Sequence, residues 1–189
     1  TRPGDAIAIA TPTYFGLLQL AEEMNLRVIE VPCHPGTGLD IDALEVVLSQ
    51  APVKACLAVT NFDNPLGALM SDENKQRLVR LLARHDLPLI EDDIYGDLAF
   101  DGSRPRPAKA FDRDGRVLLC GSISKTMAAG YRVGWVASGH LVPHESADVM
   151  LVDSHVITSI VQGNGYRDFG SQDPDVLGAL HFRIDDAAN

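Results

Sequence analysis

The stretch VLLCGSISKTMAAGYRVGWV, residues 117–136, decides how this sequence is interpreted. An apolar run ends there in two serines and a lysine, and a second apolar run follows a glycine and an arginine. A lysine at the end of a buried strand usually points into water. The alternative is that Lys125 is a nucleophilic amine, and the rest of the chain must decide between the two interpretations.

The composition is that of an ordinary globular protein. Of the 189 residues, 46% are hydrophobic and 22% are charged, which suits one domain with a real core. The formal net charge of -10 argues against a general basic surface for nucleic acid. Every apolar run is interrupted before it reaches membrane-spanning length. The three cysteines, an odd number, favour reduced and buried thiols in a cytoplasmic protein.

Hydrophobic patterning predicts an α/β fold. Amphipathic repeats predict a helix over residues 15–24, a second helix capped by Asp40 and a third capped by Ser71. Apolar runs predict strands over residues 6–10, 26–32, 53–62, 87–95, 117–125 and 132–138. Strands that are almost wholly apolar and are separated by helices indicate a mostly parallel sheet with both faces covered.

Polar side chains follow four of these predicted strands: Tyr14, Asn64, Asp92 with Tyr95, and Lys125. In parallel sheets, ligands bind beyond the carboxyl ends of the strands. Four separate strand ends that each supply a polar group toward one crevice are hard to explain by solvation alone. We therefore expect a binding site at this edge of the sheet.

The chemistry of a reactive lysine narrows the kind of site. A lysine amine that forms a Schiff base needs an aldehyde partner, and pyridoxal phosphate is the common one. That cofactor requires a carboxylate at its pyridine nitrogen, hydrogen-bonding groups at its ring hydroxyl, and hydroxyls with an arginine at its phosphate. The sequence offers all of these, with Ser122, Ser124 and Arg132 bracketing the lysine.

Four motifs carry a family resemblance. SISKTMAAGYRVGWV resembles the lysine motif of fold-type I pyridoxal-phosphate enzymes, the class I and II aminotransferase family. TNFDNPLG resembles the Asn-Pro-Thr-Gly segment of that family, EDDIYGDL its Asp-x-x-Tyr segment, and PTYFG the loop whose aromatic residue stacks on the cofactor. The motifs occur in the family's order, and the resemblance implies the large domain of an aspartate aminotransferase-like fold.

The resemblance also implies a role for each matching residue. Lys125 would be the Schiff-base lysine and the base that moves the substrate proton. Asp92 would pair with the pyridine nitrogen, because Asp93 should point to the opposite face of the sheet. The remaining residues would hold the ring hydroxyl (Asn64, Tyr95), stack on the ring (Tyr14) and bind the phosphate (Ser122, Ser124, Arg132). The structural alternatives are a helix cap for Asp92, core packing for Tyr14 and a turn residue for Asn64.

The wording of the motifs most resembles MocR-type regulators, in which an N-terminal winged-helix domain of the GntR class precedes an aminotransferase-like domain. Two functions follow: transamination between an amino acid and a 2-oxo acid, or an effector-binding module that does not turn over. A remnant without function is a third alternative. The resemblance implies a homodimer, whereas the cysteines favour a cytoplasmic location and the interrupted apolar runs indicate no membrane partner. DNA would be bound only through a separate N-terminal domain.

The resemblance weakens toward both ends of the chain. We assign residues 1–142 to the cofactor-binding core and residues 143–189 to an atypical tail that does not match the family. The start TRPGDAIAIA lacks an initiator methionine, and the family's glycine- and serine-rich phosphate loop should precede it, so we expect the chain to begin inside a larger protein. His140 and His144 flank Pro143, which breaks helical spacing, so no metal site is predicted. Arg167 and Arg183 in the tail have no motif context and receive no role.

Overall fold

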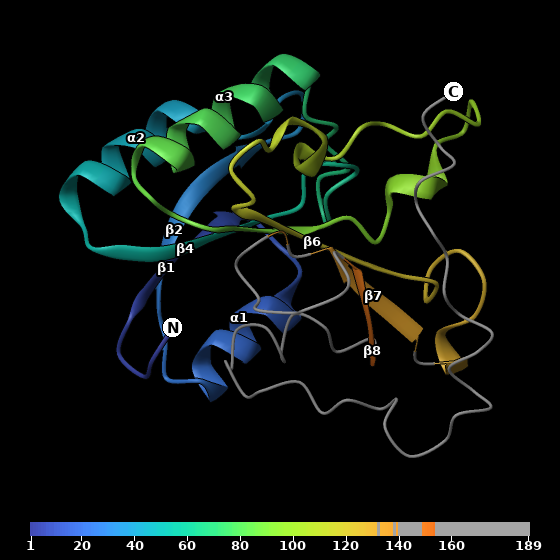
Figure 1. Ribbon diagram of the computed structural model, residues 1–189, viewed down its shortest axis with the longest axis horizontal. Helices are drawn as coiled ribbons and strands as arrows, with labels where there is room; N and C mark the ends of the chain where they lie inside the picture. Colours follow the sequence, from blue (N-terminus) through green and yellow to red (C-terminus); the bar gives the residue numbers. More distant parts are fainter. Residues whose placement is uncertain (132, 138, 140–148, 154–189) are drawn as a thin grey trace.

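A computed structural model describes residues 1–131, 133–137, 139 and 149–153. Its centre is a sheet with the strand order β3-β2-β1-β4-β5-β6-β7-β8 (Figure 1). The strands are β1 (Ala6–Thr11), β2 (Arg27–His34), β3 (Gly38–Leu39), β4 (Val53–Ala58), β5 (Leu89–Asp92), β6 (Val117–Ser122), β7 (Val133–Ala137) and β8 (Val149–Asp153). Strands β2, β1, β4, β5 and β6 run parallel, whereas β3, β7 and β8 pair antiparallel. The mostly parallel sheet predicted from the sequence is confirmed.

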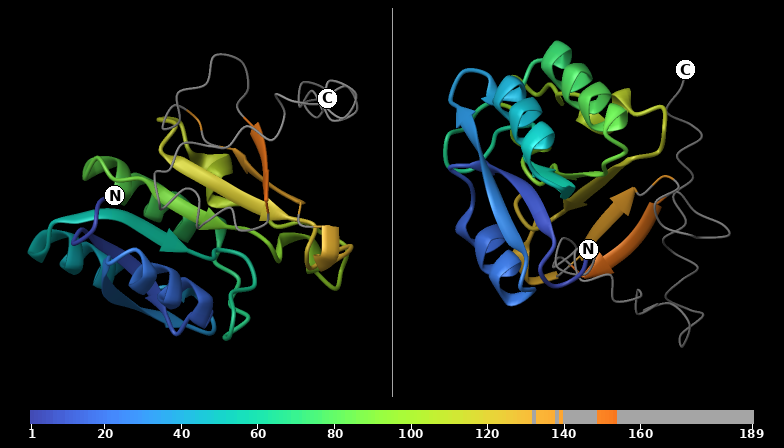
Figure 2. Two further views of the ribbon diagram at one scale, coloured as in Figure 1. Left: turned by 90° about the horizontal axis from the view of Figure 1, so that it is seen from below. Right: turned by 90° about the vertical axis from the view of Figure 1, so that its left-hand side faces the viewer.

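Three α-helices cover the two faces of this sheet (Figures 1 and 2). Helix α1 (Phe15–Glu23) lies on one face, and helices α2 (Ile41–Gln50) and α3 (Asp72–Arg84) lie side by side on the other. The chain moves outward from β1 to β2 and then returns past β1 to β4, so right-handed crossovers place α1 and α2 on opposite faces. Short 3-10 turns are η1 (Gly96–Leu98), η2 (Ala108–Phe111) and η3 (Ala129–Tyr131).

The helices begin where the sequence predicts. The Asp40 carboxylate accepts a hydrogen bond from the backbone N–H of Ala43 at 2.9 Å, and the Ser71 hydroxyl accepts one from Asn74 at 3.2 Å. Each cap satisfies one of the unpaired N–H groups at the start of its helix. Helix α1 starts at Phe15 without a side-chain cap, and it ends at Glu23, within one residue of the expected range.

Alternating side chains of the strands build two hydrophobic layers. On the α2 and α3 face, Leu44, Leu78 and Leu82 pack onto side chains of β1, β4 and β5. On the α1 face, Leu17 and Leu20 pack onto the other side of the same strands. The three free cysteines, Cys33, Cys56 and Cys120, are all buried, which agrees with the prediction of buried thiols. Within the described residues, no helix is long and apolar enough to span a bilayer.

The structure departs from the sequence-based elements at several strand ends. Strand β4 stops at Ala58, before the expected end at residue 62, and β5 stops at Asp92, before residue 95. The polar residues after these strand ends form side-chain hydrogen bonds between loops instead of extending the backbone pairing of the strands. The segment of β3, for which the patterning predicts no strand, forms a short antiparallel pair with the end of β2. Of the predicted tail, only the β8 segment lies within the described residues.

Candidate functional site

The predicted site residues gather at one edge of the sheet. Strands β1, β4, β5 and β6 are consecutive neighbours and parallel, so their carboxyl ends lie along the same edge. The strand order reverses between β1 and β4, because the chain builds outward on either side of that pair. Ligands of open α/β sheets bind at such a reversal. The predicted polar side chains that the structure describes therefore lie at the kind of sheet edge where such ligands bind.

Asp92 is the last residue of β5, and its carboxyl group is largely buried on the α1 side of the sheet. The side chain of Ile90, two residues earlier in the strand, lies on the same side, and Asp92 pairs with Cys120 of the neighbouring strand β6. Its carboxylate accepts a hydrogen bond from the backbone N–H of Ile94 at 3.3 Å. Burial raises the pKa of Asp92 from 3.8 to about 6, and the neighbouring charges of Asp93 and Glu91 act in the same direction. Within the described residues, this carboxyl group has no cationic partner.

Asp93 points to the opposite face, as the alternation along a strand requires. Its carboxylate accepts hydrogen bonds from the Asn61 side chain at 2.7 Å and from Arg104 at 2.8 Å. Glu91 also lies on that side, where Thr60 and the backbone N–H groups of Ala108 and Lys109 donate to it. Asp92 is thus the carboxylate of the EDD run that is directed toward the α1 side.

Asn64 and Tyr95 come from different loops and meet beyond the strand ends. The Asn64 amide nitrogen donates to the Tyr95 hydroxyl at 3.4 Å, and both side chains are half-buried. Asn64 precedes Pro65 in a turn, as the structural alternative states, and the peptide bond between them is cis. The turn and the contact with Tyr95 coexist, so two hydrogen-bonding groups are held at one point.

The lysine motif forms a turn immediately after β6. Ser122 ends the strand and is buried, and its hydroxyl accepts a hydrogen bond from the backbone N–H of Ser124 at 3.3 Å. The Ser124 hydroxyl is buried and has no hydrogen-bond partner among the described residues. Lys125 follows in the turn with an exposed side chain. Arg132, predicted to bind phosphate, lies outside the described residues, as do His140, His144, Arg167 and Arg183.

Tyr14 stands between β1 and α1, where the alternative of core packing does not hold. Tyr14 is 46% exposed, and its ring lies against the ring of Phe15, which is also exposed, with the two ring centroids 4.8 Å apart. A Cβ atom on Gly16 would collide with the Tyr14 ring. The PTYFG segment therefore needs glycine at position 16 to keep the Tyr14 ring in this place.

Sequence reasoning missed a buried polar network beneath these residues. Lys75 of α3 is 1% exposed, although lysines on helices usually face water. Its amine donates to the Asn61 side-chain oxygen at 2.6 Å and to the Arg106 carbonyl at 2.7 Å. The sequence feature that could have predicted this burial is the helical spacing, because Lys75 lies on the same inward face of the helix as Leu78 and Leu82.

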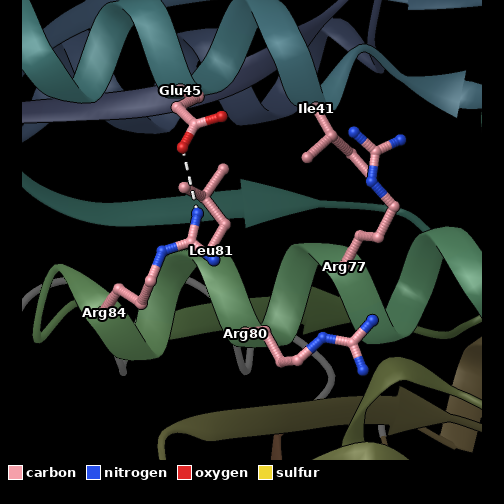
Figure 3. A pocket seen from close by; sticks show the side chains of 6 residues that line it. All are labelled: Ile41, Glu45, Arg77, Arg80, Leu81 and Arg84. Atoms are coloured by element: carbon pink, nitrogen blue, oxygen red, sulfur yellow. Dashed lines mark hydrogen bonds and ion pairs between the residues drawn. The ribbon is translucent and has the colours of Figure 1, made fainter.

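A surface pocket lies elsewhere, on the outer side of α2 and α3 (Figure 3). It is lined by Ile41, Glu45, Arg77, Arg80, Leu81 and Arg84, and it contains none of the predicted site residues. Arg84 pairs with Glu45 at 3.0 Å and Arg77 with Asp42 at 2.7 Å, so carboxylates of α2 neutralise two of its three arginines. We interpret this pocket as a solvated seam between two helices.

The chemistry of the sheet edge fits pyridoxal phosphate on two observations. The orphaned Ser124 hydroxyl is a donor beside Lys125 without a partner, and the Asp92 carboxylate is a buried anion without a cation among the described residues. A phosphate acceptor would satisfy the first, and a protonated ring nitrogen would satisfy the second.

The comparison with protein families is decisive. The sequence model of the aminotransferase class I and II family matches residues 1–160 of this chain. The chain belongs to this family. The family predicted from the four motifs is therefore confirmed, and with it the fold-type I architecture.

Curated relatives fall into two groups. The chain is 48% identical to the uncharacterized HTH-type transcriptional regulator YjiR of Escherichia coli, over 73% of this chain and 29% of that regulator. It is 34% identical to aromatic-amino-acid aminotransferase 1 of Thermococcus litoralis, over 72% of this chain and 34% of the enzyme. The chain thus spans about a third of the length of these relatives. Both groups were anticipated by the resemblance to MocR-type regulators and aminotransferases.

Solved structures show the same architecture. Kynurenine aminotransferase of Pyrococcus horikoshii, solved in complex with PMP, superposes with a TM-score of 0.68 and 28% identity, over 85% of this chain and 37% of that enzyme. The α-aminoadipate aminotransferase LysN of Thermus thermophilus, solved with N-(5'-phosphopyridoxyl)-L-leucine, gives a TM-score of 0.69 and 27% identity, over 86% and 39% of the two chains. The chain is accordingly an aminotransferase-like domain of the pyridoxal-phosphate-dependent class.

Proposed function

We propose that residues 1–142 form the cofactor-binding core of a pyridoxal-phosphate-dependent aminotransferase and that Lys125 is its attachment point. The observation that carries this proposal is the buried and unpartnered Ser124 hydroxyl, directly before the exposed Lys125 at the end of β6. A buried hydroxyl without a partner costs free energy in the free protein, and a bound phosphate oxygen would remove that cost.

Each neighbouring side chain has a role that follows from its place at the sheet edge. Asp92 would hold the ring nitrogen in its protonated form, and the ion pair would lower the pKa of its carboxyl from about 6. Asn64 and Tyr95, already in contact, would hold the ring hydroxyl. Tyr14 would cover the ring, and Ser122, Ser124 and Arg132 would bind the phosphate.

The proposed reaction is transamination between an amino acid and a 2-oxo acid. The bound cofactor supplies an electron sink that stabilises negative charge at the substrate's α-carbon. The Lys125 amine would take the α-proton and deliver it to the carbon on the other side of the substrate nitrogen, because it lies where the cofactor would be attached.

A second candidate function is an effector-binding module that holds the cofactor without turnover. The observation in its favour is that two HTH-type regulators of Escherichia coli, at 48% and 44% identity, are more similar to the chain than the aromatic aminotransferase, at 34%. In that case the parent protein would bind DNA through a separate domain, and the chain described here would sense the cofactor or an amine. For either function we propose a homodimer and a cytoplasmic location.

The test is cofactor attachment. The purified chain, a Lys125→Ala variant and a Lys54→Ala control are mixed with pyridoxal phosphate and then reduced with borohydride. Lys54 is an exposed lysine of β4 and serves as the matched control. We expect a visible absorption band and a cofactor-labelled peptide containing Lys125 in the chain and in the control, but not in Lys125→Ala. Equal labelling of all three proteins would refute the assignment of Lys125.

A panel of amino acids then separates the two candidate functions. Release of the matching 2-oxo acid supports the aminotransferase. Retention of the labelled lysine with every amino acid, and no 2-oxo acid, supports the effector module.

A further inference from the structure

The buried network under the site forms one continuous chain of hydrogen bonds. Lys75 donates to the oxygen of the Asn61 side chain at 2.6 Å, and the nitrogen of the same amide donates to Asp93 at 2.7 Å. The other oxygen of Asp93 accepts from Arg104 at 2.8 Å, and Arg104 also donates to Asp97 at 2.7 Å. The three central members are buried, with exposed fractions of 1% for Lys75, 0% for Asn61 and 3% for Asp93.

The polarity of the chain fixes the orientation of Asn61. Its amide oxygen faces an ammonium group, and its amide nitrogen faces a carboxylate. The reversed amide would place N–H groups against Lys75 and an oxygen against Asp93, with neither contact bonded. Aspartate at position 61 would repel Asp93, and leucine would remove one hydrogen bond from each of the two charged neighbours, Lys75 and Asp93. The site is therefore specific for an amide of this length.

This chain links the two loops that carry the candidate cofactor ligands. Asn61 lies three residues before Asn64 in the loop after β4, and Asp93 lies two residues before Tyr95 in the loop after β5. The Asn61–Asp93 bond is the buried crosslink between these loops, and the Asn64–Tyr95 contact at 3.4 Å lies beyond it.

Two further contacts stiffen the first loop between Asn61 and Asn64, and the second loop accommodates the crosslink through a glycine. In the first loop, Asp63 accepts hydrogen bonds from the Cys33 thiol at 3.1 Å and from the backbone N–H of Ala68 at 2.5 Å. In the second loop, a Cβ atom on Gly96 would lie 2.6 Å from the Asp93 carboxylate, so glycine there leaves room for the crosslink. A displacement at the buried end is therefore transmitted to the tips.

We propose that Asn61 and Asp93 are positioning residues of the cofactor site, which set the spacing between Asn64 and Tyr95 from the face of the sheet opposite to Asp92. They act through these two residues and touch no ligand. The proposal rests on the proposed function for the identity of the bound ring. The spacing itself is a property of the free protein.

The structure supplies a test that exchanges the two side chains. Asn61→Asp alone places two carboxylates at the former 2.7 Å contact. In the double variant, Asn61→Asp with Asp93→Asn, the carboxylate at position 61 accepts from Lys75 and from the amide nitrogen at position 93. The amide oxygen at position 93 then accepts from Arg104. The double variant restores every bond of the chain except the long 3.4 Å contact from Asn61 to the Pro105 carbonyl.

The matched control is Thr60→Val, at the position directly before Asn61. This substitution removes a buried hydrogen bond to Glu91 but no bond of the chain that runs from Lys75 to Arg104. It therefore reports what the loss of a neighbouring buried hydrogen bond does to the fold in general.

The first readout needs no cofactor. A nuclear Overhauser effect between the Asn64 side-chain amide and the Tyr95 ring is expected in the unmodified chain and in Thr60→Val. We expect it to disappear in Asn61→Asp and to return in the double variant. A contact that persists in folded Asn61→Asp overturns the proposal.

The second readout is the affinity for pyridoxal phosphate, measured by the absorption band that depends on Lys125. Loss of a hydrogen bond to a charged group should weaken binding by about tenfold or more in Asn61→Asp, with the double variant within about threefold of the unmodified chain. Thr60→Val should bind normally once the proteins are compared at matched folded fractions. Equal weakening of cofactor binding in Thr60→Val and Asn61→Asp would overturn the proposal, because it would show that the network contributes only to the general stability of the fold.

The two readouts separate failure of the proposed function from failure of this inference. If the unmodified chain forms no Lys125-dependent band, the proposed function fails, and the cofactor part of the inference fails with it. The nuclear Overhauser effect alone then decides whether Asn61 and Asp93 set the spacing between Asn64 and Tyr95. If the band forms and Asn61→Asp changes neither readout, the inference fails while the proposed function stands.

Discussion

The ionised Asp92 carboxylate should make the free protein less stable, so Asp92→Asn should stabilise it. Burial raises the pKa of Asp92 from 3.8 to about 6, and a buried anion without a cation costs free energy. At about 1.4 kcal/mol for each pKa unit, keeping this group ionised costs about 3 kcal/mol near neutral pH. Asparagine has nearly the same shape and no charge to desolvate.

The sign of the pH dependence follows from proton binding. Between pH 3.8 and about 6 the folded chain holds a proton on Asp92 that the unfolded chain has released. The contribution of Asp92 to folding stability is therefore neutral below pH 3.8, falls as the pH rises toward 6, and is constant above it. The Asp92→Asn variant lacks this decline.

The assay is denaturant unfolding of both proteins between pH 4 and pH 8. Trp135 is the single tryptophan, and its indole packs over Gly121 between β7 and β6, so its fluorescence reports on the sheet. We expect the stability of Asp92→Asn relative to the unmodified chain to grow by about 2–3 kcal/mol from pH 4 to pH 7. Asp42→Asn, which removes an exposed partner of Arg77, should change stability by less than about 1 kcal/mol.

A stability difference between Asp92→Asn and the unmodified chain that stays constant across this pH range would refute the reasoning, because the cost would not then come from ionisation. A variant less stable than the unmodified chain at neutral pH would show instead that a cation within the protein already pairs with Asp92.

Three further predictions concern the buried polar groups. Lys75→Met leaves the Asn61 side-chain oxygen and the Arg106 carbonyl without their donor, so it should lower the free energy of unfolding by about 2–4 kcal/mol in the same denaturant assay. The control Lys54→Met, on the surface of β4, should change the free energy of unfolding by less than about 0.5 kcal/mol. Ser124→Ala removes an unpaired buried hydroxyl and should stabilise the cofactor-free chain by about 1 kcal/mol while weakening cofactor binding in an absorbance titration; a loss of stability would show that the hydroxyl is satisfied in solution. Gly96→Ala places a methyl group against Asp93 and should cost about 1–3 kcal/mol, seen as a lower midpoint of thermal unfolding, and an unchanged midpoint would contradict the tight contact.

Much of the fold was predictable because it depends on local patterns. The apolar runs and the helices capped by Asp40 and Ser71 follow from residues within a few positions of one another, and the structure reproduces them. The directions of Asp92 and Asp93 follow from the two-residue alternation of a strand. These features require no knowledge of distant segments.

The network of the site could not be predicted in the same way, because its bonds join distant segments. Lys75 is buried since Asn61 and the Arg106 carbonyl, 14 and 31 residues away, supply its acceptors. The same holds for Asn64 and Tyr95, which meet across 31 residues. A sequence pattern indicated that such groups share an edge of the sheet, but it did not indicate which of them touch.

The two faces of β5 differ in a way that bears on function. On the α3 side, Glu91 and Asp93 are fully bonded to the rest of the protein. On the α1 side, the Asp92 carboxylate lacks a cation, and at the neighbouring strand end the Ser124 hydroxyl lacks a hydrogen-bond partner among the described residues. Unsatisfied polar groups are rare in folded proteins and are tolerated where function requires them.

On the α1 side, a ligand would recover the free energy that the buried Asp92 carboxylate and the Ser124 hydroxyl cost the free protein. Such a ligand must carry a cation at the Asp92 carboxylate and an anion at the Ser124 hydroxyl. The same residues therefore lower the stability of the free protein and favour the bound one. For this reason Asp92→Asn and Ser124→Ala should each improve stability and weaken cofactor binding together.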